Sequence, residues 1–446
     1  MNFSRRHFIS TSASFAIGLT GLQLVSAKGS KQTLSAGYGP LKKDPRKILD
    51  LPNKFSYQVV SRAGEQMDDG FYLPGKPDGM ATFPGRIKEE MILIRNHEIN
   101  PDVSASEGPF GRGNKKAVFL NSDQIYDSGK SSPCLGGTTT LVYNTKEQRV
   151  VRQFLSLAGT ARNCAGGLTP WNSWITCEET VVGAGGPCKK DHGWCFEVPA
   201  NDQPLVNKAV PLKAMGRFNH EAVAVDPDSG SVFLTEDRHE GLLYRFVPNV
   251  PGKLELGGKL YAMCISGSPS FDTRNWQKTN FKVGQSRKIQ WIEMDEVESP
   301  KDDLRFRGFA RGAACFARGE GMWYSKNAVY FACTNGGSKK RGQVWKLTSE
   351  TLELYAEPNN PDLVDNCDNI TVSPWGDMIL CEDGGGKQYL DVITPEGDIF
   401  KLAKNSRSSS EFAGATFSPD GSTLFVNIQV DGLTLAITGP WDAKQA

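Results

Sequence analysis

The sequence predicts an all-β protein, a six-bladed β-propeller with loop insertions on one face. A hairpin motif recurs along the chain, and very little helical periodicity separates its copies. Each copy has a short strand, a turn containing Pro, Gly or Asn, and a second strand rich in β-branched and aromatic residues. The copies begin at Asp78, Cys164, His220, Gly319, Cys367 and Phe412, and the one at Asp78 is the weakest. Hairpins of one type could also form two packed sheets, so a β-sandwich is the alternative fold.

The elements between the hairpins are predicted to be further strands and surface loops. The long stretch 249–303 is rich in Gly, Ser, Lys and Asp, which predicts insertion loops on one face of the propeller. Cys188 and Cys195 flank a Gly/Lys/His loop and could pair with each other.

Composition describes a folded and nearly neutral protein. The chain has 446 residues, 39% of them hydrophobic, which is enough to bury a sizeable core. Lys and Arg number 51 against 50 Asp and Glu, a formal charge of +1. Such a chain has no basic field for nucleic acid or for an anionic membrane surface, so we expect neither as a partner.

The N-terminus predicts an export signal. Residues 1–27 contain Ser4-Arg5-Arg6, an uncharged apolar stretch from Phe15 to Val25, and a small-residue cleavage site at Ala27. The apolar stretch is too short to span a bilayer, so no stable membrane anchor is expected. We therefore expect the twin-arginine machinery as a partner, a periplasmic or secreted location, and a single domain over 28–446. Because this route carries folded proteins, it hints at a metal or cofactor inserted before export.

The hairpins repeat acidic residues at matching positions. In a propeller the inner strands line a central channel, so side chains that recur at one hairpin position converge there. Carboxylates gathered in this way need counter-cations, and hard oxygen ligands in this number suit Ca²⁺. The acidic residues expected to bind metal in the channel are Glu98, Glu178, Glu221, Glu320, Asp368 and Glu382.

Cys177 departs from an all-oxygen site. It directly precedes Glu178 at the end of a predicted strand, and neighbouring side chains in a strand face opposite sides. From the residues alone, such a cysteine is more often part of the core than a ligand.

These motifs resemble the PhoX-type alkaline phosphatases. The resemblance rests on the twin-arginine leader and on "GGLTPWNSWITCEE", "RFNHEAVAVDP", "ARGEGMWYS", "DNCDNITVSPWGDMILCEDGGG" and "EFAGATFSPDGSTLFVNIQ", which span nearly all of the mature chain. It implies an exported enzyme that hydrolyses small-molecule phosphomonoesters with two Fe³⁺ and three Ca²⁺ in the propeller channel, one iron being bound by a cysteine thiolate. On this sequence the thiolate would be Cys177, with Glu178, Glu221, Glu320 and Glu382 among the metal ligands.

Basic residues near the channel could bind the phosphate of the substrate. Arg162, Lys387 and Arg238 are the candidates, although exposed surface charge is the commoner role for such residues. We expect a monomer. Two other functions fit a propeller with acidic repeats: a calcium-dependent lactonase-type hydrolase, and a non-enzymatic binding module with structural calcium. Neither explains both the sixfold acidic pattern and Cys177.

Overall fold

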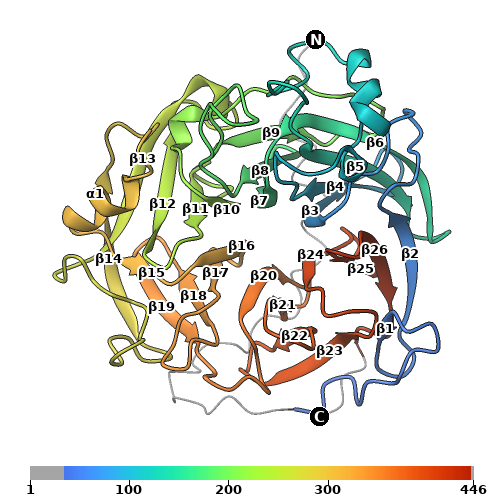
Figure 1. Cartoon of the computed structure of the whole chain (residues 1–446). Helices are drawn as coiled ribbons and strands as arrows, with labels where there is room; N and C mark the ends of the chain where they lie inside the picture. The colour runs from blue at the N-terminus through green and yellow to red at the C-terminus, as the bar shows by residue number, and fades with distance from the viewer. Residues whose placement is uncertain (1–34, 443–446) are drawn as a thin grey trace, which may run out of the picture. The chain divides into compact units, whose positions relative to one another are not determined.

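The computed structural model describes residues 35–442, which fold into an all-β, propeller-like arrangement of sheets around a central axis (Figure 1). The expected signal peptide, residues 1–27, lies outside the described residues. The only α-helix within residues 35–442 is α1 (Leu304–Ala310), and four short 3₁₀ helices accompany it. These are η1 (Ala105–Glu107), η2 (Arg112–Phe119), η3 (Lys213–Met215) and η4 (Leu254–Leu256). No helix in this part of the chain has the length and hydropathy needed to cross a membrane.

All six predicted hairpins are confirmed, and the first strand of each lies next to the axis (Figure 1). These inner strands are β3 (Pro77–Pro84), β7 (Asn163–Leu168), β10 (His220–Val225), β16 (Gly319–Ser325), β20 (Cys367–Val372) and β24 (Phe412–Phe417). Each inner strand contacts the next in chain order, and β24 contacts β3, so the circuit is closed.

The remaining strands continue each hairpin outwards through antiparallel pairing, and together they form five hydrogen-bonded sheets. The outer strands are β4 (Glu90–His97), β5 (Gly136–Asn144) and β6 (Arg149–Thr160) after β3; β8 (Ser173–Glu178) and β9 (Cys195–Pro199) after β7; β11 (Val232–Glu236), β12 (Gly241–Pro248), β13 (Gly258–Ile265) and β14 (Ser286–Glu293) after β10; β17 (Ala328–Cys333), β18 (Gln343–Leu347) and β19 (Thr351–Ala356) after β16; β21 (Met378–Glu382), β22 (Tyr389–Ile393) and β23 (Ile399–Asn405) after β20; and β25 (Thr423–Ile428) and β26 (Leu433–Thr438) after β24.

Four further pairings join parts of the chain that are distant in sequence. β14 pairs with β19, which merges the sheets of β10 and β16 into one ten-stranded sheet. Within that sheet, the short β15 (Cys315–Phe316) pairs with β12. Near the N-terminus, β1 (Leu49–Asp50) pairs with β23, and β2 (Ser56–Arg62) pairs with β26.

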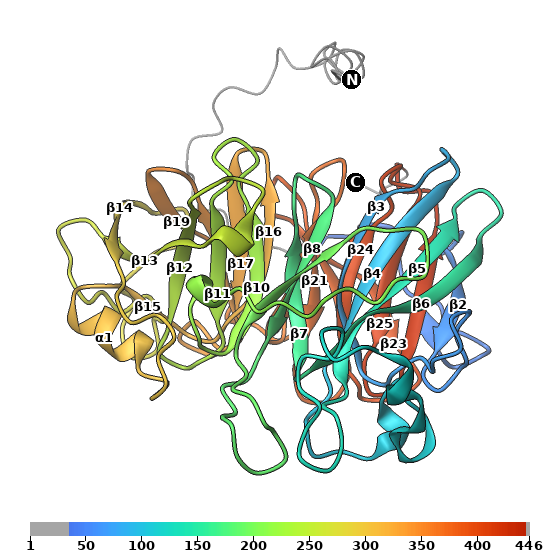
Figure 2. The ribbon, with the colours of Figure 1, turned by 90° about the horizontal axis from the view of Figure 1, so that it is seen from above.

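The prediction of insertion loops over 249–303 was only partly correct. This stretch contributes β13 and β14, because Leu260, Ala262 and Cys264 alternate along β13 and pack into the core between sheets. The larger projection is the segment between β4 and β5, which carries η1 and η2 and extends beyond the sheets on one side (Figure 2).

Close packing around the axis explains glycines in the inner strands. A Cβ added to Gly79 would lie 2.6 Å from the Cα of Ala165, and one added to Gly321 would lie 2.7 Å from the backbone N of Ile370. Neighbouring inner strands therefore approach with backbone against backbone, which leaves no room for side chains at these positions. Their polar ends are thereby held in fixed relative positions around the channel.

Candidate active site

A β-bulge near the start of each inner strand shapes the site. In all six hairpins the register between the first and second strands shifts at this point. Bulges bend a strand and change the direction of a side chain, and here the bulges carry polar side chains toward the axis. The residues within five of these bulges that lie around the axial site are Asp78, Cys164, Glu221, Glu320 and Asp368.

A second set of side chains follows the second strand of the hairpins. Each of these residues comes directly after the last residue of that strand and lines the same cavity. They are Glu98, Glu179, Asp237, Asp383 and Gln429. Because they recur at one place in the repeat, the sheets bring them to the same level of the axis.

A third set precedes the bulged residues by two positions. It comprises Arg162, Asn219, Arg318 and Glu411, all of which line the cavity. Arg162 and Arg318 have backbone φ of 49° and 53°, a left-handed conformation that is rare for residues other than glycine. Residues in this conformation are more frequent at functional sites, and here both of them line the cavity.

The cavity enclosed by these three sets has a volume of about 410 Å³ and a mainly polar lining. The acidic groups of the cavity and Cys164 form four possible cation sites, and each site shares one residue with the next. In each site one ligand atom per residue lies within 4.8 Å of the others. The four sites are Asp78–Glu98–Cys164, Cys164–Glu179–Glu221, Glu221–Glu320–Asp368 and Asp368–Asp383–Glu411.

Two of the three arginines of the cavity are held by its carboxylates. Arg162 Nη2 lies 2.6 Å from both Glu98 Oε1 and Glu179 Oε2. Arg318 binds Asp237 through Nε at 2.8 Å and Glu320 through Nη2 at 2.7 Å. Arg238 also lines the cavity. These contacts fix the guanidinium groups before any ligand arrives, which lowers the entropy lost on binding an anion.

The acids of the cavity cannot all be ionised together. Burial raises the pKa of Asp78, Glu221 and Glu320 well above the ordinary range, and the neighbouring carboxylates raise it further. Burial, with the charge of Asp383, raises the pKa of Asp368 to about 7. Asp237 differs: burial opposes its ionisation, but the Arg318 guanidinium lowers its pKa. The fold thus concentrates negative charge beyond what its three arginines neutralise.

The residues fit bound cations. Glu221 is fully buried, yet neither of its carboxylate oxygens has a hydrogen-bond partner of ordinary geometry. A buried carboxylate without a donor is costly unless a cation binds it. The donors around it combine carboxylate oxygens, which suit hard cations such as Ca²⁺, with the Cys164 sulfur, which suits softer ones such as iron.

Cys177 and Glu178, two of the expected ligands, lie elsewhere. Cys177 packs in the apolar core with its Sγ 3.7 Å from that of Cys195. Glu178 accepts hydrogen bonds from Ala161 N (2.9 Å), Gly193 N (2.8 Å), Trp194 N (3.1 Å) and His192 Nδ1 (2.6 Å). Neither side chain lines the cavity, and the cysteine that does line it is Cys164.

Glu382 and Lys387 are also outside the cavity lining. Glu382 ends β21 as Glu178 ends β8, and it accepts hydrogen bonds from Asp365 N, Tyr389 N and Lys401 Nζ at 2.9, 3.0 and 2.8 Å. Lys387 is exposed in the following glycine-rich loop. Of the basic residues expected at the site, Arg162 and Arg238 line the cavity, and Arg318 is the one that sequence reasoning missed.

Three other missed residues were one step away in the sequence. Glu179, Asp237 and Asp383 directly follow Glu178, Glu236 and Glu382, so the repeat itself marked them. A strand-ending glutamate that caps backbone N–H groups and a following acid that faces the axis form one recurring pair. No cysteine within the described residues forms a disulfide: Cys188 lies beside Cys134, and Cys195 beside Cys177, so Cys188 and Cys195 are not paired.

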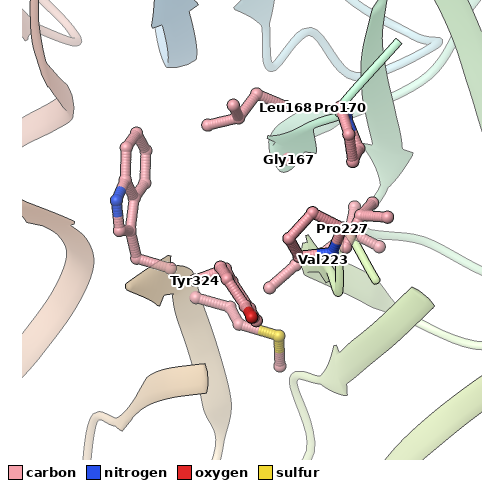
Figure 3. Close-up of a pocket in the computed structure, with 10 residues that line it drawn as sticks. Gly167, Leu168, Pro170, Val223, Pro227 and Tyr324 are labelled. Carbon is pink, nitrogen blue, oxygen red and sulfur yellow. The ribbon is translucent and has the colours of Figure 1, made fainter. Parts of the chain in front are cut away.

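The far ends of three inner strands form a different, apolar pocket. Gly167, Val223 and Tyr324 belong to β7, β10 and β16, whose opposite ends carry the acidic cluster. Figure 3 shows Leu168, Pro170, Pro227 and Tyr324 arranged around this space, which has a volume of about 170 Å³. The two ends of the inner strands thus differ sharply in chemistry, and the polar end is the candidate active site.

Comparisons with known proteins identify the fold and the family of this chain. In a structure of Pseudomonas fluorescens PhoX in complex with vanadate, a transition state analogue, the fold matches 92% of this chain and 98% of that one, with a TM-score of 0.66 and 17% identity. A gluconolactonase from Xanthomonas campestris (TM-score 0.42, 11% identity) and a virginiamycin B lyase from Staphylococcus aureus (0.40, 9%) each match 86% of this chain and, respectively, 98% and 99% of theirs. No curated protein sequence matches. The family model of alkaline phosphatase PhoX, however, matches residues 36–432, and the chain therefore belongs to the PhoX family of alkaline phosphatases.

Proposed function

We propose that this chain hydrolyses phosphomonoesters in the axial cavity, with phosphate released as a product, as expected of an alkaline phosphatase of its family. The observation that carries the proposal is the buried set around Glu221, which joins an unpartnered carboxylate to Cys164 and to further acids. A cavity with this much negative charge receives a phosphate dianion only when cations are also present.

The cations would be Fe³⁺ and Ca²⁺. Cys164, with Glu179 and Glu221 beside it, is the set suited to iron, and the all-oxygen set of Asp368, Asp383 and Glu411 is suited to calcium. Counts of two Fe³⁺ and three Ca²⁺ per chain follow the family resemblance. When bound, these cations supply positive charge that stabilises the transferring phosphoryl group.

The chain's own contribution to the reaction is orientation. Arg162 and Arg318 are fixed by carboxylates on two sides, so their remaining N–H groups can bind phosphate oxygens without a further loss of side-chain freedom. Arg238 provides a third guanidinium on the same wall. The vanadate held by the Pseudomonas enzyme is an oxyanion of the class that these groups would bind.

The architecture would be a propeller of six blades. The closed circuit of six inner strands supports this count, with the ten-stranded sheet taken as two blades joined edge to edge through β14 and β19. The mature enzyme would be a monomeric single domain over 28–446. The Arg5-Arg6 leader supports twin-arginine export to the periplasm or the medium.

The test compares Glu221→Gln with the exposed-site control Glu350→Gln. We expect the purified wild type to contain iron and calcium, to absorb visible light through a thiolate–Fe³⁺ charge-transfer band, and to hydrolyse p-nitrophenyl phosphate. Glu221→Gln should reduce kcat/KM at least about 100-fold and lower the iron content, whereas the control keeps both. Calcium without iron or colour, or turnover of lactones in place of phosphoesters, would contradict the proposal.

A further inference from the structure

A second group of metal-type side chains lies outside the channel. Asp127 and Cys134 come from the segment between β4 and β5, and Cys188 and His192 from the segment between β8 and β9. The four residues are at most 1% exposed. They belong to neither the cavity lining nor the apolar core clusters, so neither phosphate hydrolysis nor packing explains why they meet.

The spacing of their donor atoms matches a tetrahedral zinc site. The Sγ atoms of Cys134 and Cys188 are 3.9 Å apart, Cys134 Sγ is 3.7 Å from His192 Nε2, and His192 Nε2 is 3.3 Å from Asp127 Oδ2. Tetrahedral Zn²⁺, with bonds of about 2.3 Å to sulfur and about 2.0–2.2 Å to nitrogen and oxygen, separates its ligand atoms by roughly 3.3–3.8 Å. A disulfide requires about 2.05 Å between the sulfurs.

The histidine is oriented as a metal ligand. Its Nδ1 lies 2.6 Å from Glu178 Oε1, and three backbone N–H groups hold that carboxylate in place. With Nδ1 protonated toward Glu178, the Nε2 lone pair faces Asp127 and Cys134. A carboxylate that binds the distal nitrogen of a liganding histidine is the usual companion of a zinc site.

Asp127 is likewise held in position. Its Oδ2 accepts hydrogen bonds from Lys189 N and Lys190 N at 2.8 and 2.9 Å, and its Oδ1 accepts one from Gly129 N at 2.7 Å. Without a cation or a proton between them, Nε2 and Oδ2 would present two lone pairs to each other at 3.3 Å, which is unfavourable in a buried site.

We propose that Asp127, Cys134, Cys188 and His192 bind one structural Zn²⁺ that joins these two segments beside the mouth of the cavity. Both thiols lose their protons to solvent on binding, and the imidazole binds as the neutral ring. The segment between β4 and β5 begins at Glu98 and the segment between β8 and β9 at Glu179, and both carboxylates form ion pairs with Arg162. The zinc would therefore brace one rim of the active site without taking part in the reaction, and the inference stands independently of the proposed function.

The experiment measures zinc per chain in the purified full-length protein from zinc-supplemented cells. We expect about one Zn²⁺ in the wild type, in the channel variant Cys164→Ser and in the buried-cysteine control Cys264→Ser. Cys134→Ser should retain less than about a tenth of that amount. Replacement of zinc by Co²⁺ should produce a thiolate-to-cobalt absorption band that Cys134→Ser loses and Cys164→Ser keeps.

A second measurement uses the wild type alone, so it tests the site even if the Cys134→Ser variant does not fold. One sample of the wild type is titrated with an organomercurial reagent in the presence of a chromogenic zinc indicator, and the thiols of a second, denatured sample are mapped by alkylation without reductant. Release of one zinc, with Cys134 and Cys188 alkylated as free thiols, supports the site. A Cys134–Cys188 disulfide with no zinc released would overturn it.

Discussion

Glu178 and Glu179 are adjacent glutamates whose replacement should have opposite consequences. Glu178 accepts four hydrogen bonds in a fully buried position, whereas Glu179 faces the cavity and pairs with Arg162. In Glu178→Gln the new amide NH₂ group faces two of the four donors. Losing two hydrogen bonds to a buried charged acceptor, each worth about 1.5–3 kcal/mol, should lower the free energy of unfolding by about 3–6 kcal/mol.

Glu179→Gln should leave the stability of the metal-free fold almost unchanged. The amide oxygen of Gln can still accept the hydrogen bond of Arg162, which Glu98 also binds. Burial and the neighbouring acids Asp237 and Glu98 raise the pKa of Glu179 against the opposing charge of Arg162, so the loss of its charge costs little. We expect a change in unfolding free energy below about 1 kcal/mol, together with lowered metal content and at least a tenfold loss of kcat.

The assay is the thermal unfolding midpoint of both variants after removal of metals with a chelator, with activity measured before removal. At about 2–4 °C per kcal/mol for a large domain, Glu178→Gln should lower the midpoint by at least about 5 °C. If Glu178→Gln unfolds at the wild-type temperature while metal-free Glu179→Gln is the less stable variant, the assignment of the two roles is wrong.

Three further predictions concern the site and the fold. Cys164→Ser should abolish the visible absorption and most of the activity, while Cys177→Ser keeps both. Elemental analysis and visible absorption spectra of the two purified variants test this difference. Arg318→Ala should lower kcat/KM for an aryl phosphate at least about tenfold, with Arg318→Lys intermediate, and an unchanged value would remove Arg318 from phosphate binding. Burial disfavours ionisation of Asp44, but hydrogen bonds from the Tyr57 hydroxyl and three backbone N–H groups lower its pKa to about 2. Its stabilisation, about 1–2 kcal/mol after solvent screening, is present above the unfolded pKa of about 3.9 and lost as the pH falls toward 2. The difference in unfolding midpoint between wild type and Asp44→Asn should therefore narrow from pH 6 to pH 3; a constant difference would exclude this role.

The repeat predicted the positions of the inner-strand acids, because a side chain at one place in every hairpin must reach one level of the axis. Glu221, Glu320 and Asp368 were located in this way. At the ends of the second strands the cavity is lined by Glu179 and Asp383, each one residue after the predicted Glu178 and Glu382. The chain leaves the sheet there, so the pleat no longer determines which side chain faces inwards. Sequence spacing carries no information on that change of direction.

The sequence could not predict which distant segments of the chain contact each other. Nothing in the spacing of Asp127, Cys134, Cys188 and His192 indicates that loops of two neighbouring sheets meet there. Arg318 was overlooked because its neighbours in "FARGE" carry no phosphate-binding pattern, and its role depends on Asp237, which lies in another hairpin. Lys387 was a candidate because it follows a glycine run, but its side chain is exposed to solvent in that loop.

The pairing of β2 with β26 has a consequence for biosynthesis. One sheet is completed by residues 56–62 and 433–438, so the ring cannot close until almost the whole chain has left the ribosome. Until then the edge of β2 that pairs with β26 has no partner strand. The same late sheet carries Gln429, and Glu411 directly precedes its first strand, so the cavity is also finished last. A prematurely terminated product would have an open ring and an incomplete site.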